Sequence, residues 1–168
     1  MSNNSIKYNI AVVGATGQVG ETIFEILNER QFPIKNIFGL ASSKSLGKTI
    51  VCGEKTVKIS ELSKFDFESV DIAFFSAGGD ISKKYVPKAA AANCVVIDNT
   101  SAFRYESNIP LVVPEVNSSD IQQFKKTNII ANPNCSTIQM VVALKPIHEM
   151  YGIKRVNVAT YQSVSGSG

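Results

Sequence analysis

The chain has 168 residues, 44% of them hydrophobic, which is enough for one substantial core and the start of a second. Its 17 basic and 14 acidic residues give a formal charge of +3 and are scattered, so the chain lacks the basic stripe of a nucleic-acid-binding protein. The polar start does not have the apolar stretch of a signal peptide, and no run approaches the roughly 18 apolar residues that cross a bilayer. We therefore expect a cytoplasmic protein without nucleic-acid or membrane partners.

Strand and helix patterns alternate over the first part of the chain. Apolar runs rich in β-branched residues predict the strands, and apolar residues at helical spacing predict the helices. The predicted strands are residues 7–13, 35–40, 71–75 and 94–97, and the predicted helices are residues 19–27 and 82–92. This alternation is typical of a parallel sheet that is covered on both faces. The predicted fold class is α/β, with a Rossmann-like, doubly wound, mostly parallel sheet.

The later part of the chain is less regular. It contains a predicted polar helix near 119–126, a predicted strand at 128–131 and a helix that begins at Cys135. Residues 138–144 of this last helix are apolar on nearly every side, which is typical of a central helix in a larger molecule. Pro146 is expected to kink or end the helix.

The final residues suggest that the sequence has been cut from something longer. A predicted strand at 153–161 runs directly into a loop of Ser and Gly, with no helix to cover the strand. We therefore expect a dinucleotide-binding domain at 1–133 and the start of a truncated second domain, an α+β substrate domain, at 134–168.

Three glycines, Gly14, Gly17 and Gly20, lie between the first predicted strand and the first predicted helix. Glycine at these positions permits a tight turn and lets the backbone approach a pyrophosphate, which then binds free amides at the helix N-terminus. The spacing alone is a weak signal, but its place in a strand–turn–helix unit predicts dinucleotide binding rather than a purely structural turn.

The segment that follows the second strand favours NADP over NAD. NAD enzymes usually place an acid about 20 residues beyond the glycines to bind the ribose hydroxyls. No acid occurs from residue 31 to 51, and residues 41–45 instead offer hydroxyl groups and a cation where a 2′-phosphate would lie. Lys44 could equally be a solvated surface residue, so the prediction of NADP depends on the whole segment.

The three cysteines, Cys52, Cys94 and Cys135, are far apart and form no Cys-x-x-Cys pair, which argues against a disulfide framework and a metal site. Cys52 and Cys94 lie in or near strands and are interpreted as buried, inert thiols. Cys135 stands at the first turn of a helix, where unpaired amides favour a thiolate, and is the predicted nucleophile. His148 lies 13 residues further along this helix, roughly 20 Å away at 1.5 Å per residue, and is expected to be structural.

Seven segments together carry a resemblance to a known family. They are residues 14–20, 41–45, 75–79, 98–104, 113–117, 132–137 and 160–166. In order and spacing they closely resemble the aspartate-semialdehyde dehydrogenase family, over nearly all of residues 10–168. The resemblance implies an NADP-dependent enzyme that reductively dephosphorylates aspartyl phosphate to aspartate semialdehyde, on the route to lysine, methionine, threonine and isoleucine. In the oxidative direction it implies a thioester on Cys135 that inorganic phosphate cleaves.

The resemblance also implies roles for individual residues. Cys135 matches the catalytic nucleophile, Arg104 matches a substrate-phosphate contact, and Gln162 matches a residue that positions the substrate. Asn134 is expected beside the thioester carbonyl. The cofactor contacts expected from the glycine and serine patterns are Gly14, Thr16, Gly17, Gln18, Val19, Gly20, Ser42, Ser43, Lys44 and Ser45, and the resemblance adds Ser76, Gly78, Gly79, Ser165 and Gly166.

Several alternatives stay open at this point. Taken singly, Arg104 could be an ordinary surface cation, Gln162 a polar group at a strand end, and residues 165–166 a flexible turn. An N-acetyl-glutamyl-phosphate reductase has a similar fold and chemistry, although segments 134–137 and 162–166 favour the aspartate enzyme. A non-catalytic NADP-binding module is the third possibility.

The length of the chain is the departure from the family. In the family, the catalytic histidine and further substrate ligands belong to a later half that the 168 residues do not contain. The full-length enzyme is implied to be a homodimer. We therefore expect the isolated chain to bind NADP without catalytic turnover.

Overall fold

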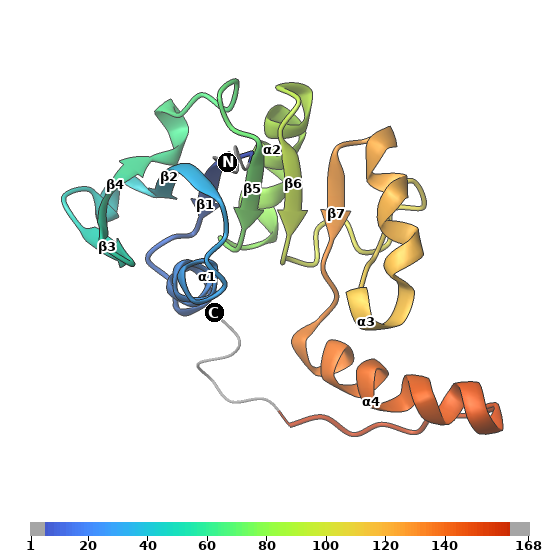
Figure 1. Ribbon diagram of the computed structural model, residues 1–168. Coiled ribbons are helices and arrows are strands. Elements are labelled where there is room, and N and C mark those ends of the chain that lie inside the picture. The colour runs from blue at the N-terminus through green and yellow to red at the C-terminus, as the bar shows by residue number, and fades with distance from the viewer. Residues whose placement is uncertain (1–5, 162–168) are drawn as a thin grey trace, which may run out of the picture.

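A computed structural model describes residues 6–161, and within them seven strands form one sheet with the order β3-β4-β2-β1-β5-β6-β7 (Figure 1). The strands are β1 (Tyr8–Val13), β2 (Ile34–Ala41), β3 (Thr49–Cys52), β4 (Lys55–Glu61), β5 (Ile72–Phe75), β6 (Val95–Asp98) and β7 (Ile129–Ala131). All neighbouring strands are parallel except β3, which pairs antiparallel with β4. The predicted doubly wound, mostly parallel sheet is confirmed.

The helices are α1 (Gln18–Glu29), α2 (Gly79–Ala91), α3 (Pro114–Asn117) and α4 (Cys135–Tyr151) within the same described residues. Short 3₁₀ segments are η1 (Ser43–Ser45), η2 (Leu62–Lys64) and η3 (Ser118–Lys126). The predicted helix near 119–126 is therefore mainly 3₁₀ and is preceded by α3. No helix among residues 6–161 has the length and hydropathy that a membrane-crossing helix needs.

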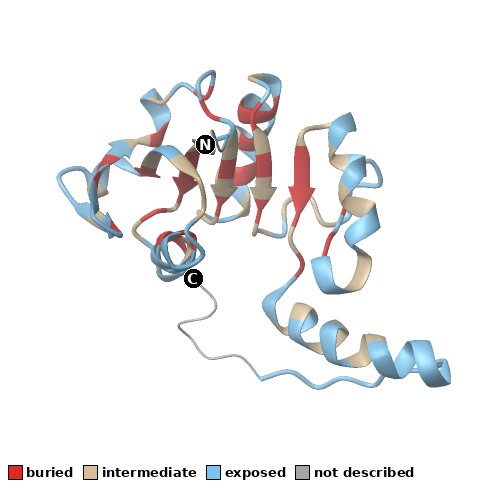
Figure 2. Cartoon of the chain, viewed as in Figure 1, coloured by how far each residue is buried: buried red, intermediate tan, exposed pale blue. Residues whose placement is uncertain are grey.

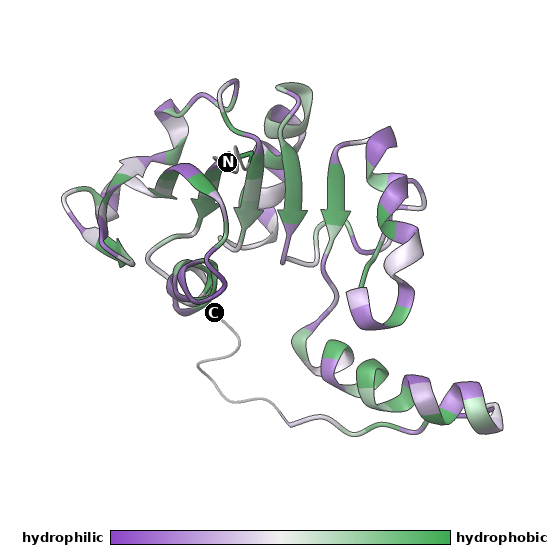
Figure 3. Cartoon of the chain, in the orientation of Figure 1, coloured by the Kyte–Doolittle hydropathy of each residue, from purple (hydrophilic) through white to green (hydrophobic). Residues whose placement is uncertain are grey.

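Two apolar clusters hold the sheet between helices. Ala11 and Val13 of β1 belong to the cluster that includes α2, which lies behind β5 and β6 in Figure 1. Ile10 and Val12 belong to the cluster that includes Phe24 of α1. Successive side chains of a strand point to opposite faces, so β1 is buried on both of them. Figures 2 and 3 show the result, central strands that are both buried and hydrophobic.

The carboxyl ends of the central strands are in register. Val13 at the end of β1 pairs with Phe75 of β5, Phe75 pairs with Asp98 of β6, and Asp98 pairs with Ala131 of β7. On the other side Val13 pairs with Leu40 of β2. The turns that follow these strands therefore begin at the same level on one edge of the sheet.

Two features of the fold differ from the sequence-based expectation. The hairpin of β3 and β4 was not predicted, and it extends the sheet beyond β2. The predicted strand at 153–161 is wrong, because these residues pair with no strand of the described chain and almost all are exposed. Their alternating apolar residues suit a strand, but a strand forms only where a neighbour supplies the ladder hydrogen bonds.

Helix α4 begins at Cys135 as predicted, and it continues through Pro146 to Tyr151. Gly152, with a φ of +68°, follows as its left-handed C-cap. None of the residues of α4 is buried within the described part of the chain, although Figure 3 shows its first half as hydrophobic. The helix leaves the sheet on the side to which the arrowheads of β5, β6 and β7 point (Figure 1).

Gly20 fixes the packing of α1 against the turn after β1, and its replacement tests that packing. A Cβ at this position would overlap the carbonyl oxygen of Gly14 and lie 2.9 Å from the Ala15 Cα atom. We expect Gly20→Ala to lower the free energy of unfolding by about 1–3 kcal/mol, because backbone cannot yield as a side chain can. Urea unfolding followed by circular dichroism measures this.

The matched control is Gly17→Ala. The nearest atom to a Cβ at Gly17 is 3.4 Å away and the φ there is −91°, so the stability change should stay within about 0.5 kcal/mol. Equal stability of the two variants would contradict the packing role of Gly20.

Candidate active site

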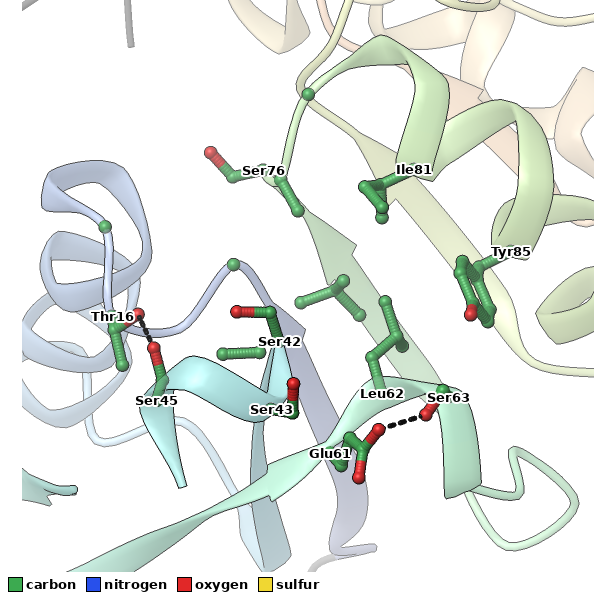
Figure 4. A pocket seen from close by; sticks show the side chains of 16 residues that line it. Thr16, Ser42, Ser43, Ser45, Glu61, Leu62, Ser63, Ser76, Ile81 and Tyr85 are labelled. Carbon is green, nitrogen blue, oxygen red and sulfur yellow. Dashed lines mark hydrogen bonds between the residues drawn. The ribbon is translucent and has the colours of Figure 1, made fainter. Parts of the chain in front are cut away.

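A cavity of about 730 Å³ lies where the carboxyl ends of β1, β2, β4 and β5 meet the start of α2 (Figure 4). Its lining residues are Val13, Gly14, Thr16, Gly17, Ala41, Ser42, Ser43, Ser45, Glu61, Leu62, Ser63, Ser76, Ala77, Gly78, Ile81 and Tyr85. In open parallel sheets, ligands bind outside the carboxyl ends of the strands, which is where this cavity lies.

The glycine turn forms one wall of the cavity from backbone alone. Gly14 has a φ of +86°, which favours glycine, and its amide donates a hydrogen bond to the Leu40 carbonyl at 2.9 Å. A Cβ on Gly14 would lie 2.5 Å from the carbonyl oxygen of Ser76, so the turns after β1 and β5 are in contact. Gly17 caps α1 without a side-chain hydrogen bond. The first amides of α1 therefore have no side-chain cap, as an anion-binding helix N-terminus requires.

The serine-rich segment after β2 forms a second wall. The hydroxyl groups of Thr16 and Ser45 share a hydrogen bond of 3.2 Å, although 29 residues separate them in the sequence (Figure 4). Ser42 and Ser43 line the cavity beside them. The structure thus brings the predicted pyrophosphate turn and the predicted 2′-phosphate segment together. Lys44 is exposed and does not line the cavity.

An acid in the cavity was missed by the sequence-based reasoning. Glu61 ends β4, and the pairing of β4 with β2 places it beside Ala41. The Ser63 hydroxyl donates to the Glu61 carboxylate at 2.5 Å, and the Lys64 ammonium lies 3.0 Å from it. The hydrogen bond from Ser63, followed by that from Lys64, lowers the pKa of the Glu61 carboxyl.

The missed lining residues come from two places in the chain. Glu61 ends the unpredicted strand β4, and Leu62 and Ser63 follow it in η2. Ile81 and Tyr85 come from the first turns of α2. The alternation of polar and apolar residues along Lys55–Glu61 was the signal that could have found this strand.

A second polar group occupies the same edge of the sheet, after β6 and β7. The Arg104 guanidinium donates from Nε to the Asn132 carbonyl at 2.9 Å and from Nη2 to the Asn99 carbonyl at 3.0 Å. The Asn132 side-chain amide donates to the Asn99 side-chain oxygen at 2.5 Å. Arg104 is therefore half-buried and tied to backbone, and of its five N–H donors these bonds use two.

Cys135 opens helix α4 three residues after Asn132. The Asn134 side chain caps this helix by accepting a hydrogen bond from the Ser136 amide at 3.0 Å. Cys135 and Asn134 are both exposed, whereas Cys52 and Cys94 are buried, and all three thiols are free. The thiol that the sequence predicts as the nucleophile is thus the exposed one of the three.

The remaining predicted site residues fall outside the cavity lining. Gln18, Val19, Gly20 and Gly79 lie in the first turns of α1 and α2 but do not line the cavity. Cys135, Arg104 and Asn134 also do not line it and belong to the neighbouring part of the same sheet edge. Gln162, Ser165 and Gly166 lie outside the described residues.

His148 lies near the end of α4, away from the cavity. The Nδ1 atom of His148 accepts a hydrogen bond from the Ile153 amide at 3.1 Å, near the end of α4, which agrees with the expected structural role. Among residues 6–161, no group of three His, Cys, Asp or Glu side chains is placed to hold a metal ion.

Comparison with known protein families shows to which family this chain belongs. The sequence profile described as "Semialdehyde dehydrogenase, NAD binding domain" matches residues 9–124. The chain belongs to this semialdehyde dehydrogenase family. The match extends from β1 into η3 and so includes every residue that lines the cavity.

Individual members of the family are also similar to this chain. Aspartate-semialdehyde dehydrogenase of Legionella pneumophila is 62% identical over 160 residues, which are 95% of this chain and 46% of that protein. The structure of aspartate semialdehyde dehydrogenase II from Vibrio cholerae complexed with ASA matches with a TM-score of 0.93 and 59% identity, over 97% of this chain and 53% of that one.

A more distant structure in the same family contains a cofactor. Aspartate semialdehyde dehydrogenase with NADP from Candida albicans matches with a TM-score of 0.74 and 26% identity, over 88% of this chain and 48% of that one. The chain spans about half the length of the curated relatives it matches.

The exposure of the three thiols predicts the order in which iodoacetamide modifies them. Burial raises the pKa of the Cys94 thiol to about 12, with a further contribution from the Asp71 charge, and burial also raises the pKa of the Cys52 thiol. Because a raised pKa favours the protonated, unreactive thiol at neutral pH, and because both thiols are buried, Cys135 should be alkylated first. Peptide mapping by mass spectrometry over time measures the three rates.

Unfolding in urea supplies the control, because all three thiols should then react at similar rates. Equal labelling of the three cysteines in the folded chain would contradict the assignment of Cys135 as the accessible nucleophile.

Proposed function

We propose that this chain forms the cofactor-binding and nucleophile-bearing part of an NADP-dependent aspartate-semialdehyde dehydrogenase. The observation that carries the proposal is the placement of two features on one sheet edge, a dinucleotide-sized cavity and an exposed thiol at a capped helix start. The names of the similar proteins support the aspartate enzyme rather than an acetylglutamyl-phosphate reductase. The pathway to lysine, methionine, threonine and isoleucine and a cytoplasmic location follow from that assignment.

The residues of the cavity fit NADP. The backbone of Gly14 and Gly17 lines the cavity without side chains, and the capping position of α1 carries no side-chain acceptor, which suits a pyrophosphate at the start of this helix. Ser42, Ser43 and Ser45 supply hydroxyl donors for the 2′-phosphate, with Lys44 adjacent to them. The nicotinamide of bound NADP supplies the hydride acceptor for oxidation of the aldehyde.

Cys135 performs the covalent part of the proposed reaction. In the oxidative direction its thiolate adds to the aldehyde carbon of aspartate semialdehyde, and loss of hydride from that carbon leaves a thioester. An oxygen of inorganic phosphate then attacks the thioester carbon, and the carbon–sulfur bond breaks to give aspartyl phosphate and free thiolate. The biosynthetic direction is the reverse sequence of steps.

Neighbouring side chains orient the reacting groups in this proposal. The Asn134 side-chain oxygen caps α4, so its NH₂ group stays free to donate to the thioester oxygen. Arg104 keeps three N–H donors for the phosphate while two donors fix its position. The remaining proposed substrate and cofactor contacts are Gln162, Ser165, Gly166, Gln18, Val19, Gly20, Ser76, Gly78 and Gly79.

The division of the chain at residue 134 belongs to the proposal as well. Residues 1–133 would form the cofactor domain, and residues 134–168 would begin a substrate domain that supplies the catalytic base and further substrate ligands in a homodimeric enzyme. Lys145, in the middle of α4, donates to the Val116 carbonyl at 2.8 Å, which connects this helix to α3.

Coenzyme preference tests the assignment of the serine segment. The 168-residue chain should bind NADP about tenfold more tightly than NAD, because charge-assisted hydrogen bonds to the 2′-phosphate contribute about 1.5 kcal/mol or more. Ser43→Ala should reduce this preference and leave NAD affinity unchanged. Isothermal titration calorimetry with both nucleotides measures the ratio, and equal affinities in the unaltered chain would refute the 2′-phosphate site.

The glycine turn gives a second test of cofactor binding. Gly17→Ala should weaken NADP binding by about tenfold or more, because the added methyl group stands where the backbone approaches the pyrophosphate. Its unchanged urea unfolding curve separates this effect from loss of the fold. Unaltered NADP affinity in Gly17→Ala would place the pyrophosphate elsewhere.

Catalytic turnover should be absent in the isolated chain. With aspartate semialdehyde, phosphate and NADP present, we expect no steady-state formation of NADPH, because the proposed base and remaining ligands lie beyond these residues. An absorbance assay for NADPH measures the rate, with a full-length family member as the positive control. Turnover at the rate of that control would show that the chain is catalytically sufficient.

A further inference from the structure

Asp98 is a fully buried carboxylate that the proposed chemistry does not use. It ends β6 and has no exposed surface, and neither ion pair among the described residues includes it. A carboxylate is costly to bury without a cation, and an apolar residue of similar size usually fills such a position at lower cost. A carboxylate at this buried position points to a directional role.

Three hydrogen bonds converge on this carboxylate. The Ser82 hydroxyl donates to Oδ1 at 2.7 Å, and the Thr100 backbone amide donates to the same oxygen at 3.2 Å. The Thr100 hydroxyl donates to Oδ2 at 2.8 Å and in turn accepts from the Ala102 amide at 3.2 Å. Ser82, like Asp98, is fully buried. The carboxylate therefore connects α2 to the turn after β6.

The two residues that bind Asp98, Ser82 and Thr100, each lie beside one part of the site. Ser82 lies in the first turn of α2, directly after the turn of Ser76 and Gly78 that lines the cavity. On the other side, the turn that starts at Thr100 carries Arg104, which spans the carbonyls of Asn99 and Asn132.

The Asn132 backbone connects Asp98 to the segment that carries Cys135. Its amide donates to the Asp98 carbonyl at 2.8 Å, and the chain then passes through Pro133, which is buried, to the helix cap and Cys135. The side chain and backbone of Asp98 thus contact both the α2 side and the Cys135 side of the site.

We propose that Asp98 is a positioning residue that holds the cofactor cavity and the Cys135 thiol in a fixed relation. The inference rests on the proposed function, because a fixed relation matters only if a dinucleotide and Cys135 act together. A carboxylate suits this role because its two oxygens accept several directed bonds at once, which an apolar side chain of the same volume cannot do.

The test measures whether NADP binding changes the rate at which the Cys135 thiol is alkylated. The rate of Cys135 alkylation by iodoacetamide is determined in the 168-residue chain with and without saturating NADP, and the ratio of the two rates is the coupling factor. In the unaltered chain we expect a factor of about five, within the usual range for coupled sites. NADP affinity and thermal unfolding are recorded for each variant.

Substitutions of Thr100 give the most specific test of the Asp98 hydrogen bonds. Thr100→Val removes the hydroxyl bond to Asp98 at nearly constant volume, and the coupling factor should fall to about one while NADP affinity is kept within about twofold. Thr100→Ser restores the hydroxyl and should restore the coupling. Asp98→Asn should act like Thr100→Val, and Thr100→Val remains decisive where Asp98→Asn does not fold.

Thr127→Val is the matched control. Thr127 accepts a hydrogen bond from the Ile129 amide at 3.3 Å before β7, at the opposite edge of the sheet, so the same chemical change is made away from the site. Its coupling factor should equal that of the unaltered chain.

The outcomes separate this proposal from the proposed function. Full coupling in folded Thr100→Val, an equal loss in Thr127→Val, or no response of Cys135 to saturating NADP in the unaltered chain would each overturn the positioning role. Failure of the unaltered chain to bind NADP would instead overturn the proposed function on which it rests.

Discussion

The in-register carboxyl ends of β1, β5, β6 and β7 are the constraint on which the rest of the structure depends. Because these strands are parallel and end at paired residues, the turns after them start at one level of one sheet edge. A slip of one residue would turn a whole strand to the other face, and both faces are packed against apolar side chains. The core thus fixes where the cavity and the turn that leads to Cys135 begin on the sheet edge.

The edge that results is polar, and its polar groups satisfy one another. Arg104 binds two backbone carbonyls, the two asparagine side chains after β6 and β7 bind each other, and Asp98 receives three donors. No buried side-chain nitrogen or oxygen of the described residues lacks a partner. A network in which every group is satisfied has one favoured arrangement, whereas a partly satisfied one loses more free energy than an apolar replacement would. The buried polar groups of the edge are therefore held in one arrangement, whereas three N–H donors of Arg104 are not used by these bonds.

The sequence was sufficient for features that depend on local periodicity. The strand–glycine–helix unit at Tyr8–Glu29, the buried strands and the start of α4 at Cys135 were predicted because each carries its own apolar pattern or turn residue. The strand at 153–161 was wrong because a ladder needs a partner that periodicity does not show. The hairpin of β3 and β4 was missed, and with it Glu61, because the search for an acid followed the chain while the sheet joins residues across it. The bonds of Arg104 to backbone carbonyls were likewise invisible in the sequence.

Glu61 shows why coenzyme preference depends on the position of an acid more than on its presence. A carboxylate at the end of the second strand binds the ribose hydroxyls of NAD and repels a 2′-phosphate. Here that place is taken by Ser42 and η1, and the acid stands one strand further out, on β4. Its charge is offset by the ammonium of Lys64 and its oxygen is engaged by Ser63. The acid is therefore bound by its own neighbours, and the hydroxyls of Ser42 and Ser43 line the cavity at the point where the two coenzymes differ, while the Ser45 hydroxyl is bonded to Thr16. In the proposed function, the preference for the phosphorylated coenzyme therefore depends on the serine segment after β2, beside an acid whose carboxylate is engaged by Ser63 and Lys64.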